Sequence, residues 1–297
     1  MTTSVDELMA FTVFSEDEVE RIGIGMISRR SVRNGHVLFP AHFGSTAAVL
    51  ADQFMDLQTT DIEGAKLTAE ENSEDGLKSF LAAHYWLWIG PKNSHVMSTH
   101  LGLYEKACRG KPVWHWIEKI SCLESFKIVW DKQAKFTDGA KIFSITTDGV
   151  DFKRWEPKHP RYPIDKKQCS HKFKSAGYRY LVCISVQTGH CVKISPPFPA
   201  STHDMVIFFK CVKPFLRWED GVIGGKAFGS SRPDEFHMSR PNTQDEQELA
   251  KFKSRARCRH ESFNKRMKNF ASMDHTWRLT TDQHRQAFTV VALTVQY

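Results

Sequence analysis

Residues 178–195, YRYLVCISVQTGHCVKIS, decide the fold class of the second half of this chain. Large apolar side chains occupy every second position from Tyr178 to Val186, which is the period of a strand with one face in a core. The run Gln187–His190 predicts a turn, and Cys191–Ser195 predicts a returning strand. We therefore expect an antiparallel hairpin at this place.

Further short elements flank the hairpin on both sides. Upstream, KIFSITT at 141–147 predicts a strand that runs into Asp148–Gly149. Downstream, the pattern predicts a helix at 204–216, a short strand at 221–224, a polar surface insertion at 229–250 and a long helix at 254–270. The order strand, hairpin, helix, strand, helix matches the start of a ribonuclease-H-like fold. We expect residues 136–297 to form such an α/β domain, a mixed sheet with flanking helices.

The preceding region, residues 1–135, shows the period of helices instead. Ser15 followed by Glu18 has the spacing of a capping box, which predicts a helix start. The other expected elements are a helix capped by Ser45, a polar connector at 58–76, a helix at 77–89 ended by Gly90–Pro91, and a short helix at 94–100. We therefore expect an all-α region before the α/β domain.

The end of this helical region carries a clean apolar stripe. Pro112 suits the first turn of a helix, and Val113, Trp116, Ile117 and Ile120 follow it on one face. Three short helices with tight breaks are compatible with a helix-turn-helix that reads DNA. Such trios are also the commonest way to build any small helical domain. The pattern leaves both interpretations open.

Composition excludes several classes of protein. With 41% hydrophobic and 12% aromatic residues among 297, the chain can bury a core, which excludes disorder over most of its length. No apolar run approaches the roughly 18–20 residues of a spanning helix, and the acidic start lacks the pattern of a secretory signal. The lack of such a run predicts no membrane partner. Seven scattered cysteines, an odd number, predict reduced thiols in an intracellular protein.

Charge is distributed unevenly along the chain, whose net charge is +7. Residues 1–140 hold 14 basic and 19 acidic side chains, whereas residues 141–297 hold 27 and 15. A basic half of this kind favours a polyanionic partner such as nucleic acid, because binding to phosphates releases counterions. A merely soluble basic surface is the alternative.

The strongest local concentration of positive charge lies between 251 and 268, where eight basic residues surround one acid, Glu261. An ordinary ion-paired glutamate would explain it, since Arg257 and Lys265 lie one helical turn away on either side. A metal ligand among phosphate-gripping neighbours would explain it equally well. Asp148 has a similar alternative, because Asp-Gly is a common turn dipeptide.

Five blocks of the second half together resemble the DDE-superfamily endonuclease domain of PIF/Harbinger-type transposases. They are TTDGVDFKRWEP from 146, CSHKFKSAGYRYLVCISVQTG from 169, PPFPASTHDMVIF from 196, VIGGKAF from 222 and ARCRHESFNKRMKNF from 256. The resemblance covers about residues 141–290, and the stretch from Phe39 to Trp130 looks more loosely like the helical part that precedes this domain in related proteins. It implies metal-dependent cleavage and transfer of DNA strands.

The resemblance also implies roles for individual residues. Asp148 takes the position of the first catalytic aspartate and Glu261 that of the final glutamate, with Mg²⁺ or Mn²⁺ as the cofactor. Two such ions roughly 3.5–4 Å apart clamp the attacking and leaving oxygens of a phosphodiester. Asp204 matches a further acid, which either assists the metal site or caps the helix it opens. The expected contacts to the DNA backbone are Arg255, Arg257, Arg259, Lys265 and Lys268.

One departure from the family pattern bears on activity. Gly225 stands where related sequences have the second catalytic aspartate, and Asp220 lies too far upstream to replace it. Three hypotheses follow: an active nuclease, a degenerate or domesticated copy that binds DNA or a partner protein without cutting, and a structural module independent of DNA. Under the first two hypotheses we expect a nuclear location. Whether a separate accessory protein supplies part of the DNA binding is left open by the sequence.

Overall fold

The computed structural model divides the chain into two compact units, with the boundary between Leu123 and Glu124. We call the residues up to Leu123 the helical unit and Glu124–Gln296 the α/β unit. The boundary lies earlier than the predicted one, which was between 135 and 136. The structure describes residues 12–27, 35–91, 94–101, 110–130, 136–138, 141–156, 165–217, 220–225, 228 and 247–296.

A short helix, α8 (Glu124–Lys127), accounts for the earlier boundary. Glu124 accepts hydrogen bonds from Arg285 Nη2 at 2.5 Å and from Thr289 Oγ1 at 3.2 Å. Gln296 donates to the carbonyl of Lys127 at 3.0 Å. All three partners lie on α12 (Thr281–Gln296), so α8 belongs to the α/β unit. The periodicity of neighbouring residues does not reveal these contacts between α8 and α12, which are far apart in the sequence.

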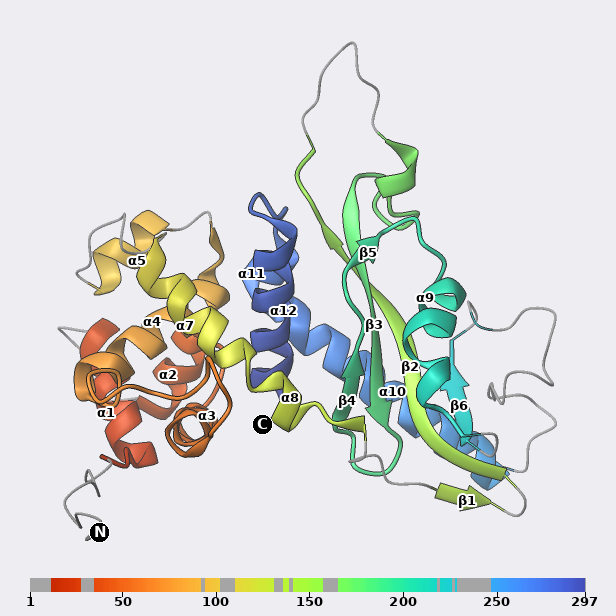
Figure 1. Ribbon diagram of the computed structural model, residues 1–297, viewed down its shortest axis with the longest axis horizontal. Coiled ribbons are helices and arrows are strands. Elements are labelled where there is room, and N and C mark those ends of the chain that lie inside the picture. The colour runs from red at the N-terminus through yellow and green to blue at the C-terminus, as the bar shows by residue number, and fades with distance from the viewer. Residues whose placement is uncertain are drawn as a thin grey trace, which may run out of the picture. The chain divides into compact units, whose positions relative to one another are not determined.

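The helical unit confirms the expected all-α region, in which local signals set the helix ends. Glu18 Oε2 accepts from the Ser15 amide at 2.8 Å and Ser15 Oγ accepts from the Glu18 amide at 3.3 Å, so the predicted capping box is confirmed. The described helices, shown in Figure 1, are α1 (Glu16–Ile27), α2 (Gly35–Phe43), α3 (Ala47–Thr59), α4 (Glu74–Ile89), α5 (Ser94–Leu101) and α7 (Lys111–Ser121).

Two predicted helix starts are wrong by a few residues. Thr46, not Ser45, caps α3, because its hydroxyl accepts from the Val49 amide at 3.3 Å. Helix α4 begins at Glu74 rather than at 77, since the Ser73 hydroxyl accepts from the Gly76 amide at 3.1 Å. It ends at Gly90 as predicted, and Gly90 takes a φ of 81° that favours glycine.

The apolar stripe of α7 lies in the core of the helical unit, as predicted. Val113, Trp116, Ile117 and Ile120 are all buried. The Trp116 ring lies 6.0 Å from Phe54 and 5.9 Å from Phe80 between centroids. The helix-turn-helix prediction stays a prediction, because residues 102–109 between α5 and α7 lie outside the described residues.

A buried ion pair stabilises the helical unit. Lys119 Nζ lies 2.8 Å from Glu71 Oε2 and donates to the carbonyl of Lys66 at 2.8 Å. Burial alone would raise the pKa of Glu71, but hydrogen bonds from Lys119, the Thr68 amide and His115 outweigh it and lower the pKa to about 2. The ionised form is therefore favoured by folding.

We expect Glu71→Gln to destabilise the helical unit by about 3 kcal/mol at neutral pH, because it leaves the buried Lys119 ammonium unpaired. The folded pKa of Glu71 lies below its ordinary value of 4.5, so this contribution is complete above pH 4.5 and is lost as pH falls toward 2. Urea denaturation of the native chain and of Glu71→Gln at several pH values measures the difference between their free energies of unfolding. Glu70→Gln, on the exposed neighbour, is the matched control. A difference that persists unchanged near pH 2 would contradict the assignment.

The α/β unit contains a mixed six-stranded sheet flanked by helices, which confirms the predicted fold class at this level. Antiparallel strands follow the order β2–β3–β4, and β6 pairs with β2 in parallel. Strand β1 pairs with the start of β2, and β5 pairs with β3. The strands are β1 (Phe136–Asp138), β2 (Lys141–Lys153), β3 (Gly177–Ser185), β4 (Cys191–Ile194), β5 (Phe198–Pro199) and β6 (Asp220–Gly224).

The hairpin of β3 and β4 is confirmed, whereas the end of β2 is not where the sequence predicts it. Asp148 and Gly149 are not a turn: they lie within β2, opposite Val182 and Leu181 of β3. The strand continues to Lys153, so Asp148 does not end it. The pairing with β3 holds the Asp-Gly dipeptide extended, against its local preference for a turn.

Two helix predictions also need correction. The helix predicted at 204–216 divides into α9 (Asp204–Cys211) and a 3₁₀ turn at Lys213–Phe215, where Pro214 has no amide hydrogen to continue the α-helix. The helix predicted at 254–270 begins earlier, as α10 (Gln247–Asn269). Of the predicted surface insertion, residues 229–246 lie outside the described residues and 247–250 are helical.

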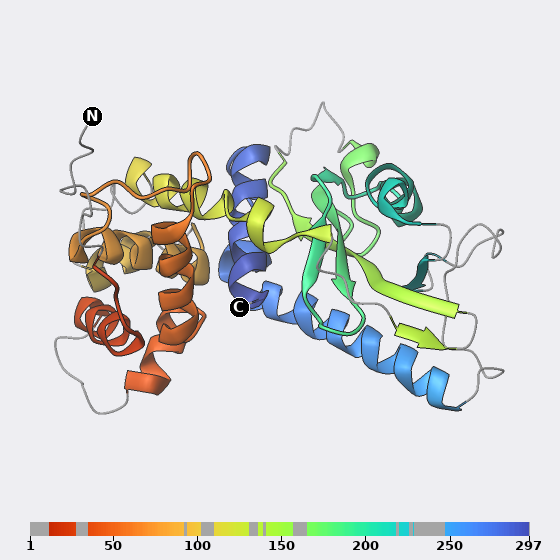
Figure 2. The same cartoon turned by 60° about the horizontal axis from the view of Figure 1, so that its bottom comes forward.

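Helices α9 and α10 cover opposite faces of the sheet (Figures 1 and 2). On one face, Ile145 and Leu181 share a core cluster with Phe208 of α9. On the other, Phe143 and Ile223 pack with Ala256 of α10. Within the described part of the chain, no helix is long and apolar enough to cross a membrane.

Candidate functional site

Asp148 lies in the middle of β2, on the face of the sheet that carries α10. Its side chain is half-buried, and Asn264 Nδ2 of α10 lies 3.4 Å from its Oδ2 atom. Burial raises the pKa of Asp148, and the charge of Asp204 adds to this, while Lys172 and Arg257 oppose it. Burial outweighs these cations, so the pKa of Asp148 lies above the ordinary value for an aspartate.

Gly225 follows β6 directly and lies beside Asp148. Strand β6 pairs in parallel with β2, so that Gly224 is opposite Thr147, while Asp220 is opposite Ile142 at the far end. A Cβ atom built on Gly225 would lie 3.8 Å from Asp148 Oδ1, which is ordinary van der Waals contact. A side chain at 225 would therefore stand next to the Asp148 carboxylate, and glycine supplies none. Asp220 is at the wrong end to substitute, as predicted.

Glu261 lies on α10, but its side chain is 68% exposed. It pairs with Arg257 one turn earlier, at 3.7 Å between Nη2 and Oε1. Asn264, three residues further along the same helix, is the α10 residue whose side chain contacts Asp148. Asn264 is not among the predicted site residues, although its spacing from Glu261 places both on one side of a helix.

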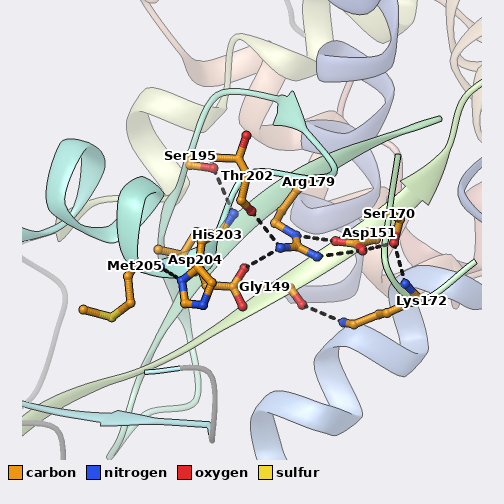
Figure 3. A network of polar contacts seen from close by, with 11 residues as sticks. Gly149, Asp151, Ser170, Lys172, Arg179, Ser195, Thr202, His203, Asp204 and Met205 are labelled. Atoms are coloured by element: carbon orange, nitrogen blue, oxygen red, sulfur yellow. Dashed lines mark hydrogen bonds and ion pairs between the residues drawn. The ribbon is translucent and has the colours of Figure 1, made fainter. Parts of the chain in front are cut away.

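Asp204 belongs to a polar network on the opposite face of β2 (Figure 3). Arg179 of β3 binds Asp151 of β2 through Nε at 2.6 Å and Nη2 at 2.9 Å. The Nη1 atom of Arg179 lies 3.5 Å from Asp204 Oδ1 and donates to the Thr202 carbonyl at 2.7 Å. Arg179 thus holds two carboxylates, one from the sheet and one from α9.

The two roles predicted for Asp204 are resolved differently. The capping role is wrong: His203 caps α9, with its Nδ1 accepting from the Met205 amide at 3.2 Å. The other predicted role of Asp204 was to assist a metal ion. In the structure its carboxylate instead forms an ion pair with Arg179. Burial raises the pKa of Asp204, while Arg179 and Lys172 oppose this.

Gly149 is a glycine because Asp204 packs against it. A Cβ atom at this position would lie 2.2 Å from Asp204 Oδ1, a distance that requires the carboxylate to move. Asp148 and Gly149 therefore contact different helices on opposite faces of β2. Asp148 lies beside Asn264 of α10, and Gly149 leaves room for Asp204 of α9.

Asp151 and Arg179 are a buried pair that the sequence analysis missed. Their side chains are 1% and 9% exposed, and they stand directly opposite each other in the β2–β3 register. Opposite charges in such cross-strand positions stabilise a sheet. The pair could have been found from the sequence only if β2 had been extended past Gly149.

The five basic residues predicted to contact DNA differ in their surroundings. Arg255 and Lys265 are exposed on α10. Arg259 instead donates to the carbonyls of Val186 at 2.8 Å and Gln187 at 3.1 Å, which fastens α10 to the β3–β4 hairpin. Arg257 pairs with Glu261 as described. Desolvation and, after it, the Lys172 ammonium lower the pKa of Lys268.

These side chains do not fit the two-ion site that the family resemblance implies. Within the described ranges, no group of three or more His, Cys, Asp or Glu residues is placed to hold a metal ion. Asp148 has its carboxylate at the site, Gly225 supplies no ligand, and Glu261 is exposed and paired with Arg257. Asp204 is held by Arg179 on the other face of β2.

Comparisons with known proteins add no family assignment. No protein-family model matches the chain, and neither the curated proteins nor the solved structures give a significant match.

Proposed function

We propose that this chain is a transposase-derived, ribonuclease-H-like protein that binds the backbone of DNA and does not cleave it. The strand order supports the fold: three antiparallel strands, β2 to β4, are followed by α9, then by β6 parallel to β2, then by α10. A ribonuclease-H-like fold has this order, and its catalytic acids lie on the first strand, after the fourth strand and on a late helix.

One observation carries the proposal: the position after β6 lies beside Asp148 and is a glycine. The parallel pairing of β2 and β6 brings these two positions together, and a Cβ atom at 225 would be in contact with the Asp148 carboxylate. This closeness supports a nuclease-derived centre in which the acid that would bridge two ions is missing. Without it, in-line displacement at a phosphodiester lacks its second ion.

The basic side chains of α10 support DNA as the partner. Eight lysines and arginines lie between 251 and 268, and Arg255, Lys265, Arg266 and Lys268 are exposed. Exposed cations on one long helix suit a phosphate backbone, which they contact without reading bases. With DNA as its partner, the protein is proposed to act in the nucleus.

The affinity for a short DNA duplex as a function of salt tests this function. With about five phosphates neutralised, log K should fall with log salt at a slope of about −4.5 between about 50 and 200 mM. The measurement is made in EDTA, so that no metal ion contributes. A slope shallower than about −2 would contradict the proposal and leave α10 as a solvated surface.

A further inference from the structure

Trp155 is an exposed tryptophan just beyond the end of β2. It is 47% exposed, whereas the other tryptophans that the structure describes are buried or half-buried. Tryptophan is highly buried on average, so an exposed ring at a fixed position is a candidate for contact with a partner.

Hydrogen bonds on both sides fix the backbone that carries this ring. The Trp155 amide donates to the Trp277 carbonyl at 2.7 Å, and the Trp277 amide donates to the Lys153 carbonyl at 2.9 Å. On the other side, the Arg154 amide donates to the Ala176 carbonyl at 2.9 Å. The ring therefore stands on an ordered backbone, and binding a partner needs little further ordering there.

A second aromatic ring and an ammonium group lie on the same face of the sheet as Trp155. Because this pairing keeps the chain extended, Lys153 and Trp155 point to one face and Arg154 to the other. Lys153 Nζ lies 6.0 Å from the centroid of the Phe173 ring. Phe173 is half-buried against Gly177, where a Cβ atom would lie only 2.7 Å from its Cζ atom.

The segments at this end of the sheet carry an excess of positive charge. Positions 153–156 and 165–174 hold six lysines and arginines but two acids. Lys172 and Lys174 are both exposed in the loop that packs on the end of β2. Exposed cations next to aromatic rings are the means by which proteins bind single-stranded nucleic acid, since the cations contact phosphates and the rings stack on bases.

We propose that Trp155 is a stacking site for an unpaired base of DNA, and that Lys153, Lys172 and Lys174 contact the adjoining phosphates. In a duplex each base is already stacked between its neighbours, so the ring takes a base from a single-stranded segment. The inference deepens the proposed DNA binding by naming a DNA structure that the chain prefers. It rests on neither a metal ion nor the residue at position 225.

Fluorescence anisotropy of labelled DNA in EDTA tests the stacking. One DNA is an oligothymidylate, and its matched control has the same phosphates but abasic sugars in place of the bases. The native chain should bind the oligothymidylate at least about fivefold more tightly, because stacking on one base contributes that much. Trp155→Ala should bind both DNAs equally, whereas Trp155→Phe should keep part of the preference. Phe126→Ala removes a ring that is 49% exposed on α8, and it should leave the preference unchanged.

Two binding results would overturn the inference: equal binding of the two DNAs by the native chain, or a preference that persists in Trp155→Ala. A smaller oligomer for Trp155→Ala than for the native chain, measured by sedimentation, would also overturn it, because the ring would then lie between two copies. Circular dichroism shows whether each variant is folded. The affinity for a blunt duplex tests the proposed function separately, so either proposal can fail while the other holds.

Discussion

Replacing Arg179 by methionine is expected to destabilise the α/β unit by about 3–5 kcal/mol. The change removes the cation from between Asp151, whose side chain is 1% exposed, and Asp204, whose side chain is 12% exposed. Both carboxylates would remain buried without their strongest partner. A buried carboxylate without its cation lowers the free energy of unfolding by far more than the intact pair raises it, because the desolvation penalty is no longer offset.

The matched control for this prediction is Arg257→Met. It removes an arginine of the same size, but its partner Glu261 is largely exposed, so the expected loss is only about 0.5 kcal/mol. Adding Asp151→Asn to Arg179→Met should recover part of the stability. Hydrogen exchange during a urea titration, read on peptides from β2 and β3, reports the α/β unit within the full chain. Equal losses for Arg179→Met and Arg257→Met would contradict the network's structural role.

Removing two lysines from α10 is expected to have the largest effect on DNA binding. Lys265→Ala with Lys268→Ala takes away two phosphate contacts, so the salt slope should become shallower by about 1.8. The loss of these two phosphate contacts corresponds to roughly 60-fold weaker binding of DNA at about 0.1 M salt. Both side chains are exposed, so the free energy of unfolding should change little.

A double variant on α9 and the following 3₁₀ turn provides the comparison. Lys210→Ala with Lys213→Ala removes the same charge, but from the opposite face of the sheet (Figure 2). Its salt slope should match that of the native chain. If both double variants weaken binding equally, net charge rather than α10 explains the affinity, and the proposed interface is wrong.

Local sequence signals were enough where neighbouring residues decide the structure. The Ser15–Glu18 capping box and the end of α4 at Gly90 depend on a few adjacent residues. The hairpin at 178–195 depends on alternation over a short range, which the β3–β4 pairing confirms. The first two features set helix ends in the helical unit, and the hairpin gives part of the sheet of the α/β unit.

Signals from distant parts of the chain were missed for a physical reason. Asp148–Gly149 favours a turn by itself, and only pairing with β3 and packing by Asp204 make it part of a strand. Asn264 contacts Asp148 across a large sequence separation that no local period encodes. Helix α12 was likewise not predicted, although its residues 287–295 are all buried.

The candidate site could be predicted in part. Gly225 directly follows β6, the strand that pairs with β2, while Asp148 lies within β2 rather than at its predicted end. The ion pair of Glu261 with Arg257 is one of the two predicted alternatives, because these residues lie one helical turn apart. The contact of Asp204 with Arg179 could not be predicted, because it joins α9 to β3. Sequence position suggests a ligand, but the neighbouring charges decide whether it is available.

Nicking of supercoiled plasmid in Mn²⁺, with plasmid binding recorded by gel shift in the same samples, tests the central claim most directly. We expect the native chain to shift the plasmid and leave it supercoiled, because position 225 supplies no acid beside Asp148. The account would be contradicted if the native chain nicked the plasmid and Asp148→Ala abolished the nicking.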